Sequence, residues 1–165
     1  MAAALTTAWG DFAVAMAGAA AALAGLVMVA ISVNIKEILA YRGLTARAAS
    51  AIGSLVLVVV MAALILVPGQ SAPLLGAEVL VAVVPVIVLH VLSLHRRTHQ
   101  SDSAGHSLAL YVPLATLQLA PVVVGALLLL LTGDGTGLYW LAAGMVVTVV
   151  GSMLDAWVLM VEILR

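Results

Sequence analysis

The chain has 165 residues, of which 65% are hydrophobic and 8% are charged, with a formal net charge of -1 at pH 7. A soluble domain has about a quarter of its residues charged, so this composition excludes a water-soluble globular fold. The chain has no cysteine, which excludes a disulfide framework, a thiolate metal site and thiol catalysis.

Five long apolar stretches follow one another along the chain, and each is long enough to cross a bilayer as a helix of about 20 residues. They do not alternate as the strands of a membrane barrel would, whereas helices satisfy their own backbone hydrogen bonds in lipid. The sequence therefore predicts a single all-α domain over residues 1–165, a polytopic transmembrane helical bundle. Its spans are expected approximately over residues 12–39, 47–67, 76–94, 107–131 and 138–164.

The first stretch begins without the basic residues that precede the apolar part of a signal peptide, so we expect a permanent span. As one helix over 12–39 it would be about 40 Å long, longer than a hydrocarbon core of about 30 Å. Its Lys36-Glu37 end should therefore protrude or tilt. The second stretch stops at Pro68-Gly69-Gln70, a strong turn signal.

The third stretch ends before His95, and the polar segment 98–105 that follows is expected to form a loop. The fourth contains Pro113 and Pro121, which are either ordinary kinks or openings in a backbone-lined route. Residues 133–137, Gly-Asp-Gly-Thr-Gly, then turn the chain into the fifth stretch.

The basic residues all fall in alternate gaps between these stretches: Lys36, Arg42, Arg47, Arg96, Arg97 and Arg165. Cytoplasmic loops carry the excess of Lys and Arg, so the pattern places the N-terminus outside and the C-terminus in the cytoplasm of a bacterial inner membrane. Trp9, Tyr139 and Trp140 lie where an outer aromatic belt belongs. Arg96 and Arg97 are expected to contact anionic lipid head groups.

Several short motifs resemble those of a group of small actinobacterial integral membrane proteins with about five spans. They are Trp9-Gly10-Asp11, Ser32-Val33-Asn34, Pro68-Gly69-Gln70, Gly137-Leu138-Tyr139-Trp140 and the closing residues 156–165. The resemblance covers nearly the whole chain and implies a lineage and a membrane location. It implies no assigned chemistry, and members of the group often have Asn where this chain has Asp155.

Small residues form two stripes at helical spacing. In the first stretch Asp11, Gly18, Gly25 and Ser32 recur every seven residues. The second stripe, in the fifth stretch, consists of Gly144, Thr148, Ser152 and Asp155. Small residues let membrane helices approach closely, so each stripe could pack inside the bundle, join copies of the chain or line a pore.

Asp155 is the most informative single residue, because it lies about 25 Å along the last span and a carboxylate at that depth is costly. Candidate partners at a similar depth are Asn34, Ser54, His90, Tyr111 and Thr116. We predict a proton or cation site formed by Asp155, His90 and Asn34. The alternatives are a hydrogen-bonded Asp155 that only locks helix packing, and a contact to a lipid or small ligand.

The polar part of the spans does not extend into their outer half. Beyond Gln118 and Thr148 the spans consist almost entirely of Ala, Val, Leu, Gly and Met. A channel would therefore need an oligomeric pore with a hydrophobic gate or a backbone-lined route. Near the cytoplasmic side, His95, His99 and His106 are weak metal candidates, because their spacing fixes no third ligand and neighbouring arginines repel a cation.

The chain contains no HExxH, G-x-S-x-G, P-loop or G-x-G-x-x-G motif. We therefore expect no enzyme activity, no cofactor and no nucleic-acid partner; a lipid-active enzyme is the least supported function. The main hypothesis is a small channel or transporter for a proton or cation that acts as a homo-oligomer in the bilayer. The alternative is a non-catalytic assembly or regulatory partner of another membrane complex.

Overall fold

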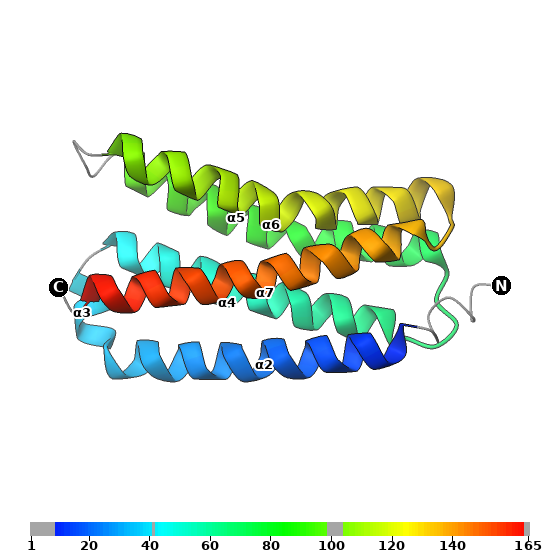
Figure 1. Ribbon diagram of the computed structural model, residues 1–165, viewed down its shortest axis with the longest axis horizontal. Coiled ribbons are helices and arrows are strands. Elements are labelled where there is room, and N and C mark those ends of the chain that lie inside the picture. The colour runs from blue at the N-terminus through cyan, green and yellow to red at the C-terminus, as the bar shows by residue number, and fades with distance from the viewer. Residues whose placement is uncertain (1–8, 41, 99–103, 164–165) are drawn as a thin grey trace.

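The computed structural model describes residues 9–40, 42–98 and 104–163, with the side chains in these ranges other than those of residues 37, 42–43, 96–98, 104–112, 114, 159 and 162–163. The described part of the chain is helical apart from short turns. Its helices are α2 (Gly10–Val33), α3 (Ile35–Ala40), α4 (Arg42–Ile65), α5 (Ala72–Thr98), α6 (Ala104–Thr132) and α7 (Thr136–Ile163). All except α3 are long and apolar enough to cross a membrane, which confirms the predicted all-helical fold with five spans (Figure 1).

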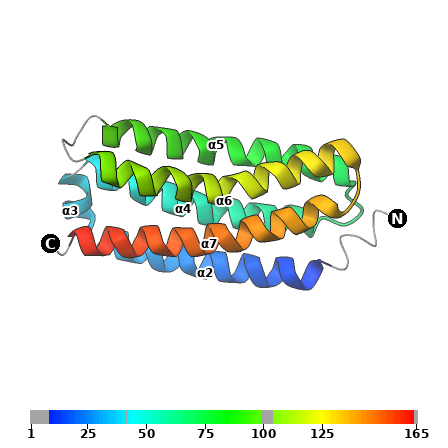
Figure 2. The ribbon, with the colours of Figure 1, turned by 45° about the horizontal axis from the view of Figure 1, so that its top comes forward.

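Helices α4, α5, α6 and α7 form a closed ring, because each packs against the next and α7 packs back against α4. The remaining span, α2, which comes first along the chain, lies outside this ring and contacts mainly α4 (Figure 2). Burial follows the same order: over an 18-residue window, 56% of the residues of α4 are buried inside the protein, against 6% for α2. The protein is therefore a four-helix bundle with one peripheral span.

The two ends of the bundle differ in charge. We call the end at which α2, α5 and α7 finish and α4 and α6 begin the basic end; it lies at the left of Figure 1. The basic positions of the described helices lie there: Lys36, Arg42, Arg47, Arg96 and Arg97. The other end, here called the far end, holds the turns at residues 66–71 and 133–135. The basic residues, which fall in alternate gaps between the apolar stretches of the sequence, thus gather at one end of the bundle.

The first apolar stretch is interrupted at Asn34 and does not continue as one helix to Leu39. Asn34 has a non-helical backbone (φ −107°, ψ 26°), and its side-chain Nδ2 donates to the carbonyl oxygen of Ala30 at 2.9 Å. Asn competes in this way with the backbone of its own helix. The short helix α3 that follows packs Ile38 against Ala48 at the start of α4.

The two turns at the far end form at the glycine-containing segments that the sequence predicts as turns. Gly69 and Gly133 have positive φ values of 73° and 69°, a conformation that favours glycine. At the second turn, the Oδ1 atom of Asp134 accepts hydrogen bonds from the Thr132 hydroxyl (2.9 Å) and the Thr136 backbone N–H (3.1 Å). These bonds favour the ionised carboxylate and lower the pKa of Asp134 below its ordinary value.

Aromatic residues join α2 to α7 at the far end. The ring of Trp9 meets the ring of Tyr139 edge to face, with centroids 4.9 Å apart, and that of Phe12 with centroids 5.8 Å apart. Such pairs prefer this geometry because of the ring quadrupoles. The contact fixes the beginning of α2 to the beginning of α7, although these helices otherwise touch little.

Glycines allow α7 to approach α6 closely. Gly137, Gly144 and Gly151 recur every seven residues on α7. A Cβ atom added to Gly137 would lie 2.4 Å from the carbonyl oxygen of Gly125, and one added to Gly144 would lie 2.6 Å from Val122 Cγ2. The two backbones are therefore in direct contact, as in other membrane helix pairs that lack a hydrophobic driving force.

Candidate functional site: a polar segment of the bundle core

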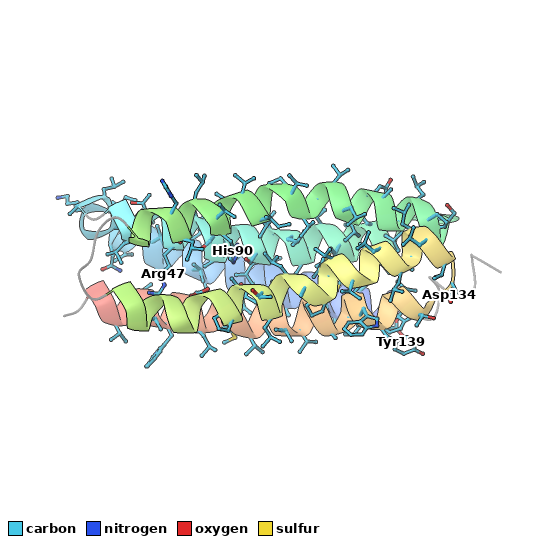
Figure 3. All side chains as sticks on the ribbon, turned by 90° about the horizontal axis from the view of Figure 1, so that it is seen from above. Arg47, His90, Asp134 and Tyr139 are labelled. Carbon is cyan, nitrogen blue, oxygen red and sulfur yellow. The ribbon has the colours of Figure 1, made fainter. Side chains whose placement is uncertain are left out.

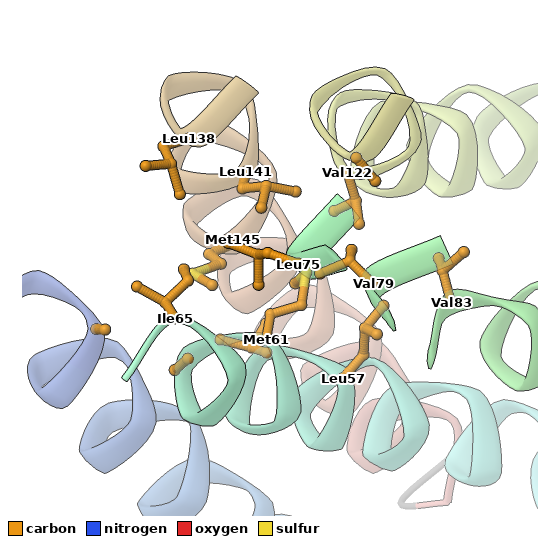
Figure 4. Close-up of a cluster of buried hydrophobic side chains, with 14 of the residues drawn as sticks. Leu57, Met61, Ile65, Leu75, Val79, Val83, Val122, Leu138, Leu141 and Met145 are labelled. Atoms are coloured by element: carbon orange, nitrogen blue, oxygen red, sulfur yellow. The ribbon is translucent and has the colours of Figure 1, made fainter. Parts of the chain in front are cut away.

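Among the described residues, the far-end half of the core is apolar apart from Gln70, which is buried beside the turn and donates a hydrogen bond to Glu78. The four helices of the ring contribute Leu, Val, Ile, Met and Ala side chains that pack together (Figure 4). They are Leu57, Val58, Met61 and Ile65 of α4; Leu75, Val79, Val83 and Val86 of α5; Val122, Ala126 and Leu129 of α6; and Leu138, Leu141 and Met145 of α7.

Toward the basic end, the same inward face of each helix becomes polar. The residues continue the helical spacing of three or four, and each is less than 9% exposed. They are Ser54, Ser50 and Arg47 of α4; His90 and Ser93 of α5; Gln118 of α6; and Thr148, Ser152 and Asp155 of α7. All four helices change from apolar to polar at one depth, and we call these nine residues the polar core segment.

Antiparallel packing arranges this segment in layers one helical turn apart. The contact between Arg47 and Asp155 places these two residues near one depth, so Ser50 lies near the level of Ser152 and Ser54 near that of Thr148. Gln118 belongs to the last of these layers, because its carbonyl oxygen accepts a hydrogen bond from Thr148 Oγ1 at 3.2 Å.

Helix α5 joins the same layers. A Cβ atom added to Gly53 would lie 2.8 Å from Leu89 Cδ1, which places residues 53 and 89 at one depth. Because α4 and α5 run antiparallel, His90 lies between the levels of Ser54 and Ser50, and Ser93 lies within about one residue of the level of Ser50. Figure 3 shows Arg47 and His90 toward one end of the bundle and Asp134 and Tyr139 toward the other.

The Arg47–Asp155 ion pair is the electrostatic centre of the segment. Arg47 Nη2 lies 3.5 Å from Asp155 Oδ1, and the two side chains are 10% and 6% exposed. Burying either charge alone would be costly, and the attraction between the two charges at this distance offsets part of that cost. Sequence reasoning missed Arg47, because a basic residue at the start of an apolar stretch is usually interfacial.

Contacts are described for the other two residues of the predicted site, His90 and Asn34. Asn34 is half-buried at the junction of α2 and α3, where it binds the backbone of its own helix. His90 lies on α5, diagonally across the ring from α7, and its Nδ1 is 2.9 Å from the Val86 carbonyl oxygen. Because a carbonyl only accepts, Nδ1 carries a proton there. Among the described side chains, the ion-pair partner of Asp155 is Arg47.

His90 also borders a groove on the outer face of α5 and α6. The groove has a volume of about 370 Å³, and Thr116 is the other polar residue among its lining residues. The rest of the lining is apolar, from Ile87, Val91 and Leu94 of α5 and Ala115, Leu119, Ala120 and Val123 of α6. Thr116, expected in the inner polar layer, is exposed on this face; the Tyr111 side chain lies outside those described.

Several polar atoms of the segment have no hydrogen-bond partner within the described part of the chain. They are Ser54 Oγ, Ser93 Oγ, Ser152 Oγ and both Gln118 amide atoms, Oε1 and Nε2. Leaving a buried polar group unsatisfied costs about 1–3 kcal/mol. For these five atoms the sum is roughly 5–15 kcal/mol, as large as the whole stability of a typical domain. The segment therefore needs further polar partners.

The two small-residue stripes have different surroundings. In α7, Gly144 packs on Val122, and Thr148 and Ser152 are buried, so this stripe lies inside the bundle. In α2, Gly18, Gly25 and Ser32 are all exposed. A Cβ atom added to Gly18 or Gly25 would meet nothing within 4 Å, so no described part of the chain covers this stripe.

The weak metal candidates are only partly described. His95 is exposed near the end of α5, His99 lies outside the described residues, and the His106 side chain is not among those described. The Arg96 and Arg97 side chains, expected at lipid head groups, also lie outside that set. No group of three or more metal-ligating side chains occurs among the described residues.

Comparison of the chain with models of protein families, with curated proteins and with solved structures finds no match.

Proposed function

We propose that this protein is a small channel or transporter that takes up protons, or another small cation, into the polar core segment from the basic end. The observation that carries the proposal is Asp155, the one buried acidic side chain among those described, set among polar residues from four helices. Ionisable residues inside a membrane are costly and are typical of ion and proton pathways.

The ion pair favours a proton over a metal ion. Arg47 lies 3.5 Å from Asp155, so a metal cation would meet a positive charge at the carboxylate that should bind it. A proton, unlike a metal ion, needs no ligand beyond one oxygen of Asp155, and its binding would remove the charge that holds Arg47 in place. Uptake of a proton and release of the pair would then be one event, which couples occupancy to the packing of α4 against α7.

The apolar half of the core would act as the barrier. Between Ser54 and the far end, the buried inward-facing side chains described for the four ring helices are aliphatic, apart from Met61 and Met145. Hydrophobic constrictions close a path by excluding water. We therefore propose that the described conformation is closed at the far end, and that passage requires a second arrangement of the helices.

We further propose that copies of the chain associate through α2 in a bacterial cytoplasmic membrane. The exposed stripe with Gly18, Gly25 and Ser32 has the small residues that membrane helix pairs use. The basic end would face the cytoplasm, as the excess of Lys and Arg there favours. Arg96 and Arg97, at the end of α5, would then meet anionic head groups.

Proton flux into liposomes tests the main proposal. Purified protein is reconstituted with a trapped pH-sensitive dye, and flux driven by a potassium diffusion potential is compared with that of empty liposomes. Asp155→Asn should reduce the flux by about 100-fold or more, as loss of a proton-transfer group typically does. Asp134→Asn removes an exposed carboxylate outside the core and serves as the matched control. Flux no higher than in empty liposomes, or equal flux from Asp155→Asn, would refute the proposal.

A second candidate function is that of an assembly or regulatory partner in another membrane complex. The exposed face of α2 favours it, since that helix contributes least to the fold of its own bundle. A photo-crosslinking residue at Gly25 would capture a different protein in native membranes if this candidate is correct. Recovery of self-complexes alone would count against it and would support homo-oligomerisation.

A further inference from the structure

We infer that the polar core segment binds water, so that a small group of ordered water molecules bridges Ser54, Ser93, Ser152 and Gln118 inside the bundle. The inference concerns what fills the core between the four helices and does not depend on the proposed transport.

The first step is the state of the hydroxyl groups. A serine or threonine inside a helix can satisfy its hydroxyl by donating to a carbonyl one turn back. Ser50 does so, donating to the Arg47 carbonyl oxygen at 2.9 Å. Ser54, Ser93 and Ser152 make no such bond, although each is only 1% exposed. Their hydroxyls therefore need partners other than their own helices.

The second step is their convergence. Ser54 and Gln118 share the layer that contains Thr148, and Ser93 and Ser152 share the adjacent layer toward the basic end. Adjacent layers lie about 5.4 Å apart, the pitch of an α-helix. A water molecule between them thus has polar groups from several helices within reach, and a buried water requires two to four such partners.

The third step is the number of waters. A buried water makes about three hydrogen bonds, so roughly two waters would satisfy the five orphaned atoms. A chain of this length typically holds about six buried waters, so the requirement is modest. The aliphatic layer formed by Val58, Val86, Val122 and Met145 ends the polar surface on the far side. This layer offers water no hydrogen-bond partner, so hydration should end there.

The absence of cysteine provides a clean test. Single-cysteine variants Ser54→Cys, Ser93→Cys and Ser152→Cys, each close in shape to the native residue, are reconstituted in lipid and transferred to deuterium oxide. Infrared spectroscopy then follows conversion of the S–H to the S–D stretch, which requires water at the sulfur. Met145→Cys, fully buried in the apolar half, is the matched dry control, and its folding is checked beside the others by circular dichroism.

The serine-site thiols should exchange faster than the Met145→Cys thiol by at least about tenfold, because a dry core exchanges only through transient opening. Equal rates would overturn the inference. In the unmodified protein, magnetisation transferred from water in solid-state NMR should reach the Gln118 side-chain amide before the Met145 methyl group. Simultaneous arrival would overturn the inference even if a cysteine variant failed to fold.

These outcomes are separable from those of the flux experiment. Fast thiol exchange without proton flux keeps the hydrated core and removes the transport proposal. Proton flux with slow exchange at Ser54, Ser93 and Ser152 overturns the hydrated core. The conducting path would then lie between subunits or along the outside of the ring.

Discussion

Breaking the Arg47–Asp155 pair gives the sharpest test of the core. In Asp155→Leu, the Arg47 guanidinium would remain about nine-tenths buried without its counter-charge. Removing one partner of a buried ion pair costs about 3–5 kcal/mol, which is about two to four orders of magnitude in the unfolding equilibrium. Arginine cannot release its proton, so the protein cannot neutralise the orphaned charge. Asp155→Leu should therefore be strongly destabilised.

The complementary variants separate charge from packing. Arg47→Leu should cost less, because the orphaned Asp155 can be neutralised by binding a proton. Arg47→Leu combined with Asp155→Leu should recover most of the loss, since replacing both charges by apolar groups is often neutral or stabilising. Val150→Ala, on the exposed face of α7, is the control variant: it is purified and unfolded in the same way and should leave the free energy of unfolding nearly unchanged.

The measurement is the free energy of unfolding in mixed detergent–lipid micelles, with circular dichroism following loss of helix. If the double variant is as unstable as Asp155→Leu alone, the two side chains do not compensate each other. A loss of less than about 1 kcal/mol in the free energy of unfolding of Asp155→Leu would also refute the reasoning, because a loss that small is typical of a solvent-exposed ion pair.

Three further predictions concern other parts of the fold. Gly137→Ala should destabilise the protein by about 1–3 kcal/mol through overpacking against α6, whereas Gly25→Ala, which meets open space inside α2, should be neutral or stabilising by up to about 1 kcal/mol in the same unfolding assay. Trp9→Ala should lose two edge-to-face contacts, about 1–3 kcal/mol together, and increase hydrogen exchange at the beginning of α2. The pKa of Asp134 is held below its ordinary value, so its contribution to stability is present above the unfolded pKa and is lost as pH falls through the folded pKa. In an NMR titration Thr132→Val should move the pKa of Asp134 back toward its ordinary value, and an unchanged pKa would contradict the role of that hydrogen bond.

The sequence predicts the five spans well, because length and composition alone separate lipid-spanning helices from other structure. It also predicts that Ser54, His90 and Asp155 lie deep in the bundle near one end. It does not predict the ion pair of Asp155 with Arg47. Depth along a helix can be counted from the sequence, whereas the face that each helix turns to its neighbours depends on packing among all four.

The two glycine patterns illustrate the same limit. Gly18 and Gly25 on α2 are seven residues apart, as are Gly137 and Gly144 on α7. One pair faces away from the described chain and the other brings two backbones into contact. Spacing identifies a surface that permits close approach, but only the tertiary arrangement determines whether the chain itself uses it.

The distribution of contacts also limits how the bundle could open. At the far end, Gly137 lies against the backbone of α6, so separating α6 from α7 there would break packing over the whole apolar half. At the basic end, Arg47 of α4 and Asp155 of α7 form an ion pair at 3.5 Å. Neutralising Asp155 removes that link without disturbing the apolar half. A rearrangement that admits an ion should therefore begin at the basic end, with the far half serving as its fixed base.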